Sequence, residues 1–254
     1  MTITSDLTHD RFLGGAVAAW QPAKGYRAGV DAVLLAAALL VQPGDKVLEL
    51  GCGVGVASLC LAARVPQASI TGVELQPDYA DLARRNAAEA GADFEIVTAD
   101  LTNLPPEIRQ QSFDHVFANP PYFRRERSIA AQDPGRDTAL GGATPLRDWI
   151  DTGIRRLGPK GRFTMIQRAE RLPEILAALD DRVGAVQVLP LNARETRRAE
   201  HVLVSAQKGR KTDFRLHASL ILHSGMRHGD AEDGYTPLVS AALNGPNPLP
   251  GLEV

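Results

Sequence analysis

The chain has 254 residues, with 28 basic and 30 acidic side chains and 44% hydrophobic residues. This composition is typical of a globular protein with a sizeable core, and the net charge of -2 excludes nucleic-acid binding through overall positive charge. Two cysteines, Cys52 and Cys60, are too few for a disulfide framework and match no metal-binding spacing. Residues 1–11 do not resemble a signal peptide, and the most apolar stretch, 33–41, is far shorter than the roughly 20 residues that span a bilayer. We therefore expect a cytoplasmic protein without a metal or a membrane partner.

The predicted elements alternate between strands and helices along most of the chain. Residues 1–44 are expected to form an N-terminal helical extension, in which a polar lead precedes an Ala/Leu-rich helix with Asp31 at its N-cap. Strands are predicted at 46–50, 69–75, 94–99, 113–118 and 162–166, and helices at 56–64, 77–91, 146–157 and 172–181. Two further strands, 185–189 and 201–206, follow without a helix between them, so one of them should be antiparallel.

This alternation predicts an α/β fold, a Rossmann-like doubly wound sheet of seven mostly parallel strands with one antiparallel strand. We expect the sheet domain to span residues 45–210 and residues 211–254 to form a C-terminal extension that packs on the same domain. Residues 124–142 are rich in Gly, Arg and Asp and show little periodicity, which favours a mobile loop over the site.

A glycine loop, Glu49-Leu50-Gly51-Cys52-Gly53-Val54-Gly55, follows the first strand of this sheet and opens a helix. Glycines at this place allow a tight turn and a close approach of a ligand to the backbone. A dinucleotide fingerprint, G-x-G-x-x-G, would require glycine at position 56, where the chain has Val56. The pattern is instead E-x-G-x-G-x-G. Glu49 is expected beneath the loop, where it accepts backbone N–H groups and can meet a ligand ammonium.

Acidic side chains end the next two strands. Glu74, followed by Leu75, lies about 20 residues beyond the loop, where a carboxylate can accept hydrogen bonds from both hydroxyls of a ribose. Asp100, or the backbone beside Leu101, can meet an adenine amino group. A single acid of this kind is more often a helix cap or a solvated loop residue. The set in this order favours a nucleotide-like cofactor.

The segment Asn119-Pro120-Pro121-Tyr122 ends the strand predicted at 113–118. The Asn119 side-chain oxygen and the Pro120 carbonyl are two acceptors that can face one planar amino group, and the proline rings stiffen the backbone between them. Tyr122 offers a flat face for stacking. The segment therefore predicts nitrogen chemistry on a planar amine, although Asn-Pro is also a common strand-ending turn.

Together these motifs resemble the class I S-adenosylmethionine-dependent methyltransferases with an N-P-P-Y motif. The flanking segments 24–36, 201–209 and 233–237 are similar to the bacterial tRNA1(Val) adenine-N6 methyltransferase family. The resemblance implies S-adenosylmethionine as the cofactor, tRNA as the partner, and the adenine next to the anticodon as the target. It also implies that Asn119 to Tyr122 are catalytic. The implied cofactor-binding residues are Tyr26, Arg27, Asp31, Glu49, Gly51, Cys52, Gly53, Gly55, Glu74, Leu75, Asp100, Leu101 and Asn119.

Within that resemblance, Arg27 is expected near the cofactor carboxylate, whereas Asp31 either lies in the site or only caps its helix. Two basic clusters are candidates for phosphate contacts: Arg124, Arg125 and Arg127 in one, and Arg194, Arg197, Arg198, Lys208, Arg210 and Lys211 in the other. Three alternatives remain open at this point. They are a protein glutamine N5 methyltransferase, an rRNA guanine N2 methyltransferase, and a non-catalytic nucleotide-binding or oxidoreductase fold.

Overall fold

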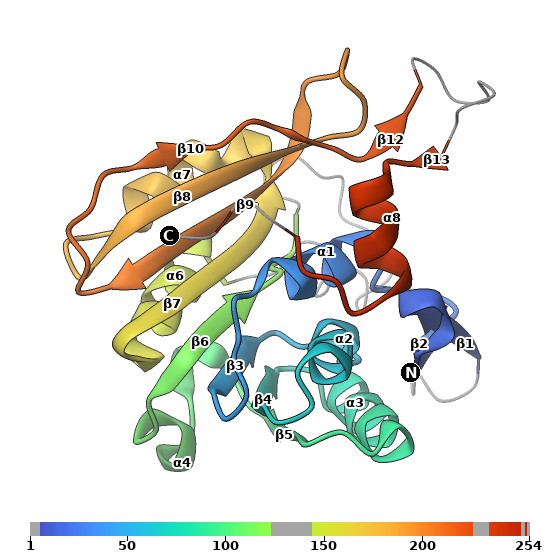
Figure 1. Ribbon diagram of the computed structural model, residues 1–254. Helices are drawn as coiled ribbons and strands as arrows, with labels where there is room; N and C mark the ends of the chain where they lie inside the picture. Colours follow the sequence, from blue (N-terminus) through green and yellow to red (C-terminus); the bar gives the residue numbers. More distant parts are fainter. Residues whose placement is uncertain (1–5, 123–143, 226–233, 250–251, 253–254) are drawn as a thin grey trace.

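Seven long strands form the central sheet of the computed structural model, which describes residues 6–122, 144–225, 234–249 and 252 (Figure 1). Their order is β8-β9-β7-β6-β3-β4-β5. The strands are β3 (Lys46–Leu50), β4 (Ser69–Glu74), β5 (Phe94–Thr98), β6 (Phe113–Ala118), β7 (Leu157–Arg168), β8 (Val183–Asn192) and β9 (Ala199–Lys208). Only β9 runs antiparallel to its neighbours, β7 and β8, so the predicted doubly wound sheet is confirmed. Two short strands, β10 (Arg215–Leu216) and β11 (Leu220–Ile221), extend the sheet beyond β8.

Helices cover both faces of this sheet. One face carries α1 (Val30–Ala38), α2 (Val56–Arg64) and α3 (Pro77–Ala90), whose buried residues form one hydrophobic cluster. The other carries α6 (Leu146–Arg156) and α7 (Leu172–Ala178), with a second cluster. The short α4 (Pro106–Arg109) and the 3-10 helices η3 (Leu101–Asn103) and η5 (Ala169–Arg171) connect these layers.

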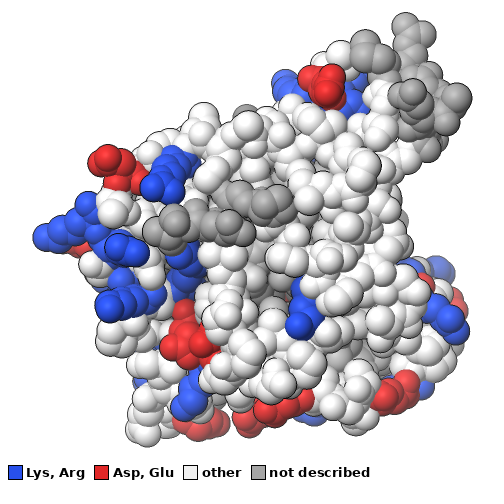
Figure 2. Space-filling view, in the orientation of Figure 1, with Lys and Arg blue, Asp and Glu red and all other residues white. Residues whose placement is uncertain are grey.

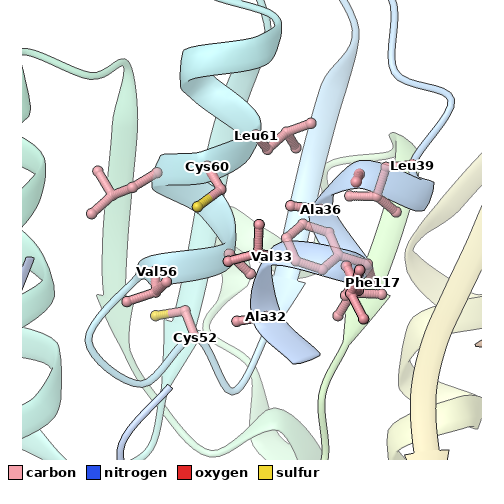
Figure 3. Close-up of a cluster of buried hydrophobic side chains, with 14 of the residues drawn as sticks. Ala32, Val33, Ala36, Leu39, Cys52, Val56, Cys60, Leu61 and Phe117 are labelled. Atoms are coloured by element: carbon pink, nitrogen blue, oxygen red, sulfur yellow. The ribbon is translucent and has the colours of Figure 1, made fainter. Parts of the chain in front are cut away.

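Helix α1 lies close against α2 and the sheet because its inner face is made of small residues. Figure 3 shows Val33 and Ala36 of α1 near Cys60 of α2, Ala32 near Cys52 of the glycine loop, and Phe117 of β6 beside α1. Alanine side chains allow two helix backbones to approach closely. Both cysteines of the chain lie in this packed layer as free thiols, and burial raises the pKa of the Cys60 thiol to about 12.

The N-terminal extension is not purely helical, in contrast to the prediction. Residues 7–22 form an antiparallel hairpin of β1 (Leu7–Phe12) and β2 (Val17–Pro22), joined by η2 (Leu13–Gly15). The hairpin is fixed to α3, since the Trp20 backbone exchanges hydrogen bonds with the Asn86 side chain. The predicted N-cap at Asp31 is also wrong: Gly29 occupies that position, and Asp31 lies in the first turn of α1.

The C-terminal residues pack on the same body. The helix α8 (Pro237–Asn244) follows the small β12 (His223–Ser224) and β13 (Gly234–Tyr235) pair and contacts α1. Leu249 and Leu252 are buried, and the Leu249 N–H donates to the Ala37 carbonyl. The predicted loop 124–142 lies outside the described residues.

Candidate active site

A pocket lies where the carboxyl ends of β3, β4, β5 and β6 meet along one edge of the sheet. Ligands of open α/β sheets bind at this edge. The pocket is lined by Tyr26, Gly51, Gly53, Val73, Glu74, Leu75, Gln76, Tyr79, Ala99, Asp100, Leu101, Asn119, Pro121, Thr144 and Trp149. Most of the predicted site residues are among them. Those that are not are Arg27, Asp31, Glu49, Cys52, Gly55, Pro120 and Tyr122.

The glycine loop is fastened to the neighbouring strand β4. The N–H groups of Gly51 and Cys52 donate to the Val73 carbonyl at 2.7 and 3.0 Å, and the Gly53 N–H donates to the Glu74 Oε2 at 2.9 Å. Gly51 has a φ of 68°, and a Cβ there would lie 2.4 Å from the Trp149 ring. The loop therefore requires glycine at this position both for its left-handed backbone and for the packing of the indole.

Glu74 is the best-placed acceptor for a ligand in this pocket. Its side chain is 6% exposed, and its second oxygen, Oε1, accepts the Gln76 N–H at 2.9 Å. Burial raises the pKa of this carboxyl, and the hydrogen bonds from Gln76 and Gly53 oppose that rise. Both oxygens thus accept backbone N–H groups, to which Leu75 also contributes, and the four lone-pair positions of a carboxylate leave room for a ligand donor. A pair of neighbouring hydroxyls, such as those of a ribose, could donate to the two oxygens of this carboxylate.

Glu49 lies beneath the loop and does not line the pocket. Its carboxylate is 3% exposed and accepts the Ser58 hydroxyl at 2.5 Å. The expected partners, backbone N–H groups of the loop, are thus replaced by Ser58 of α2, and the Gly53 N–H goes to Glu74 instead. Burial raises the pKa of Glu49 to about 8. The residue joins β3 to α2, and its position does not support the predicted contact with a ligand ammonium.

Cys52 and Gly55 also shape the loop without lining the pocket. Cys52 is buried, and burial raises the pKa of its thiol. Gly55 adopts a φ of 87° directly before α2, and a Cβ there would meet the Phe94 ring at 2.7 Å. These residues position the backbone of the loop.

The N-terminal segment contributes Tyr26 to the pocket but not Arg27. The Arg27 guanidinium pairs with Asp10 of β1 at 2.5 Å and donates to the Thr8 hydroxyl. It therefore secures the hairpin, and Arg27 is not among the residues that line the pocket, so its place at the cofactor carboxylate stays a prediction. Tyr26 is held by the Tyr79 hydroxyl, which accepts its backbone N–H at 3.0 Å. Burial and the nearby carboxylates, Glu49 foremost, raise the pKa of Tyr26, so its hydroxyl stays protonated.

Asn119 lies beside Tyr26 at the end of β6. Its Nδ2 donates to the Tyr26 hydroxyl at 3.5 Å. This use of the amide nitrogen leaves the Oδ1 as the acceptor that the side chain offers to a ligand.

Tyr122 is held from two sides. Its hydroxyl donates to the Asp31 Oδ2 at 2.8 Å, and its ring lies against the His201 ring with a centroid distance of 5.0 Å. Burial and the charge of Asp31 raise the pKa of Tyr122. Asp31 is therefore the hydrogen-bond partner of Tyr122 and is not the cap of α1, whose N-cap is Gly29.

Asp100 lines the pocket with its neighbour Leu101. Its Oδ1 accepts both the backbone N–H and the hydroxyl of Thr102 at 2.8 Å, which starts η3. Its second carboxylate oxygen is not used by Thr102, and both Asp100 and Leu101 line the pocket. This end of the pocket suits a planar amino group.

Sequence reasoning did not find three aromatic residues at the site. Trp149 of α6 covers Gly51, Tyr79 of α3 holds Tyr26, and His201 of β9 packs on Tyr122. Each occurs in a segment whose pattern is that of an ordinary helix or strand. An aromatic residue on an apolar helix face is typical of a core, so the sequence carried no signal that separates the two roles.

The second predicted basic cluster is divided between the two ends of the β8–β9 hairpin. Arg194 is buried and donates to the Ser224 and Gly225 carbonyls. The exposed Arg197 and Arg198 precede β9 at the end that carries His201, the end of the pocket. The others, Lys208, Arg210 and Lys211, lie at the opposite end of β9, where Figure 2 shows basic side chains gathered at the left edge. The first cluster, Arg124 to Arg127, lies outside the described residues.

Neither a metal site nor a membrane-spanning helix is found among the described residues. They contain no group of His, Cys, Asp and Glu side chains that is arranged to hold a metal ion. Within the same ranges, no helix is both long and apolar enough to cross a membrane.

Comparison with known proteins defines the class. Residues 47–131 match the family model described as a methyltransferase domain. A predicted O-methyltransferase from Agrobacterium tumefaciens superposes with a TM-score of 0.69 at 28% identity, over 86% of this chain and 97% of that one. TrmN from Thermus thermophilus shares the fold, with a TM-score of 0.50 at 22% identity over 70% of this chain and 48% of that one. The protein is a class I S-adenosylmethionine-dependent methyltransferase.

The relatives by sequence narrow the class to a family. A tRNA1(Val) (adenine(37)-N6)-methyltransferase from Aeromonas hydrophila is 31% identical over 84% of this chain and 89% of its own length. One from Porphyromonas gingivalis is 36% identical over 59% of this chain, and the match spans 61% of that relative. The chain belongs to the family of these methyltransferases.

Proposed function

We propose that the protein transfers a methyl group from S-adenosylmethionine to the N6 amine of an adenine in tRNA, at the position next to the anticodon. The observation that carries the proposal is the pairing of Asn119 with Tyr26. It presents the Asn119 Oδ1 as an acceptor at the wall of the pocket beside the glycine loop. The names of the relatives supply the tRNA and the adenine.

The pocket fits the cofactor in its donors and acceptors. Glu74 would accept the ribose hydroxyls, and Asp100 with Leu101 would meet the adenine amino group. The glycine loop and Tyr26 would hold the methionine end. When bound, S-adenosylmethionine supplies an electrophilic methyl group on a sulfonium.

The side chains at the end of β6 would prepare the amine. Its lone pair is delocalised into the purine ring, which makes it a weak nucleophile. Acceptance of one N–H by the Asn119 Oδ1, and of the other by the Pro120 carbonyl, would draw the N–H bonds out of the ring plane, so that the nitrogen becomes pyramidal and its lone pair is localised on it. Positioning of this kind can lower the barrier by several kcal/mol without covalent catalysis. The N–C bond would form as the bond between the methyl carbon and sulfur breaks, with S-adenosylhomocysteine as the leaving group. The methylated nitrogen would then lose one proton to solvent, so no tuned general base is required.

The base must leave its stack in the RNA to reach this pocket. The Tyr122 ring would then replace the lost stacking, which is worth about 1–3 kcal/mol per base. The bond between its hydroxyl and Asp31 and its contact with His201 fix the ring before the substrate arrives. Arg197 and Arg198 are placed to contact phosphates beside the target nucleotide. We place the reaction in the cytoplasm, where tRNA is found.

Labelled methyl transfer to tRNA tests the proposal. Purified tRNA from cells that lack the protein should accept labelled methyl groups when it is incubated with the wild-type enzyme. Digestion of that tRNA should then show the label in N6-methyladenosine. The variant Asn119→Ala should lose transfer but keep the thermal shift that S-adenosylmethionine produces. Label on a protein glutamine or on rRNA guanine, with none on tRNA, would refute the substrate. Stabilisation by NAD alone would refute the enzyme class.

A further inference from the structure

The segment from Asn119 to Tyr122 is held residue by residue by four side chains from two stretches of the chain, one around the start of α1 and one around the end of β7. Each contact uses a different atom of the segment, so its backbone and both end side chains are fixed. The holding residues are Tyr26 for Asn119, Gln167 for the Pro120 carbonyl, Arg171 for the Pro121 carbonyl, and Asp31 for the Tyr122 hydroxyl.

Gln167 is the member of this set that bonds to the proposed backbone acceptor of the amine, the Pro120 carbonyl. It lies in β7, beside β6, and is 0% exposed. Its Nε2 donates to the Pro120 carbonyl at 3.3 Å, and its Oε1 accepts the Arg168 N–H at 2.8 Å. A flip of the amide would set donor against donor and acceptor against acceptor. The orientation of Gln167 is therefore determined by both bonds.

We infer that Gln167 is a positioning residue for methyl transfer, an inference that rests on the proposed function. A carbonyl oxygen has two lone pairs. Gln167 occupies one of them from the neighbouring strand β7, which would leave the other for the amine beside the pocket-lining Asn119 and Pro121. Its donated hydrogen bond also stops the Pro120 carbonyl from turning toward other donors. Gln167 acts through Pro120 and does not touch the substrate.

A buried glutamine that only satisfies a backbone carbonyl would be a structural residue, and the chain contains one for comparison. Gln187 of β8 is 2% exposed, and its Nε2 donates to the Leu252 carbonyl at 3.3 Å. Its Oε1 is also engaged, by the His217 ring at 2.8 Å. It does not line the pocket or contact the segment from Asn119 to Tyr122 in the part of the chain that the structure describes. Both glutamines are thus buried, and in both the Nε2 donates to a backbone carbonyl at 3.3 Å while the Oε1 has a partner at 2.8 Å. They differ in the carbonyl that the Nε2 holds, which is that of Pro120 for Gln167 and that of Leu252 for Gln187.

The experiment compares Gln167→Met with Gln187→Met, and adds Gln167→Asn, which keeps an amide but shortens the side chain. We would measure kcat and KM for labelled transfer to tRNA, the affinity for S-adenosylmethionine, and the Tm. Both Gln167 variants should lower kcat about 10- to 100-fold, the scale of a displaced reactive group. Their affinity for S-adenosylmethionine should stay within about twofold of wild type, because the pocket at the glycine loop is untouched. Gln187→Met should lower the Tm without the loss of kcat.

Equal kcat values for the two methionine variants at matched fractions of folded protein would overturn the inference. So would a Gln167 defect confined to KM for S-adenosylmethionine. Failure of the proposed function has a different signature, namely a wild-type enzyme that labels a protein glutamine and not tRNA. The same variants measured on that amide would then still decide the role of Gln167, since an amide nitrogen needs the same acceptors.

Discussion

Replacement of Glu49 by glutamine should flatten the dependence of stability on pH. In the folded protein, burial raises the pKa of Glu49 from 4.5 to about 8, and in the unfolded chain the group returns to its ordinary value. Between these two values the unfolded state ionises while the folded state keeps its proton. Stability contributed by the protonated group is therefore fully present below pH 4.5 and is lost as the pH rises toward 8.

The size of the effect follows from the same difference. One pKa unit corresponds to about 1.4 kcal/mol, so the loss across this window is roughly 5 kcal/mol for a group that is 3% exposed. Domains of ordinary stability unfold with about 5–15 kcal/mol, so a change of this size is easily measured. The hydrogen bond from the Ser58 hydroxyl lowers the pKa of Glu49 and so limits the loss of stability at high pH. Removal of this hydroxyl should make that loss of stability larger.

The assay is urea unfolding of wild type and Glu49→Gln at several pH values between 5 and 8.5. The free energy of unfolding of wild type should fall by several kcal/mol more than that of the variant over this range. Glu95→Gln, which removes an exposed carboxylate of β5, controls for the change in net charge and should follow wild type. Parallel curves for wild type and Glu49→Gln would show that Glu49 is ionised in the folded protein, and would refute the argument from burial.

Three further predictions concern the pocket and its rim. Glu74→Ala should weaken the binding of S-adenosylmethionine, measured by calorimetry, about 100-fold or more, because it removes charge-assisted acceptors worth about 1.5–3 kcal/mol each. Unchanged affinity would show that Glu74 does not bind the cofactor. Tyr122→Phe should keep most of the transfer rate, whereas Tyr122→Ala should raise KM for tRNA about 10-fold or more through lost stacking, and equal losses would place the function in the hydroxyl. The double variant Arg197→Gln/Arg198→Gln should reduce the slope of log affinity for tRNA against log salt concentration by about 2. A larger effect from Lys211→Gln, at the far end of β9, would show that the RNA binds at that end and not beside the pocket.

The sequence determined the sheet, the order of its elements and the glycine loop. Strands such as Lys46–Leu50 and Phe113–Ala118 are short apolar runs, and helix α3 begins at Pro77 and ends before Gly91. These signals are local: an apolar run, a proline at the first turn and a glycine at the end act within a few residues. The prediction of these elements therefore required no knowledge of the tertiary contacts.

The N-terminal hairpin shows where local signals fail. Its first strand is polar on one side, and the pair is stabilised by contacts that arise only after folding, such as the bonds between Trp20 and Asn86 and between Arg27 and Asp10. An isolated two-stranded hairpin is marginal in water. The sequence could not show that Arg27 pairs with Asp10, because that contact exists only once the hairpin has formed.

The tertiary structure alone decided how the predicted residues are held. The sequence named Asn119 to Tyr122 from four consecutive positions, but their partners lie up to 93 residues away, as Tyr26 does from Asn119. The sequence around Gln167 does not indicate its role, because the partner of a polar side chain inside a strand is known only when the neighbouring strand is known. Motif residues are recognisable from chemistry and spacing. The side chains that orient them depend on which strands and helices pack together, and only the folded chain brings those into contact.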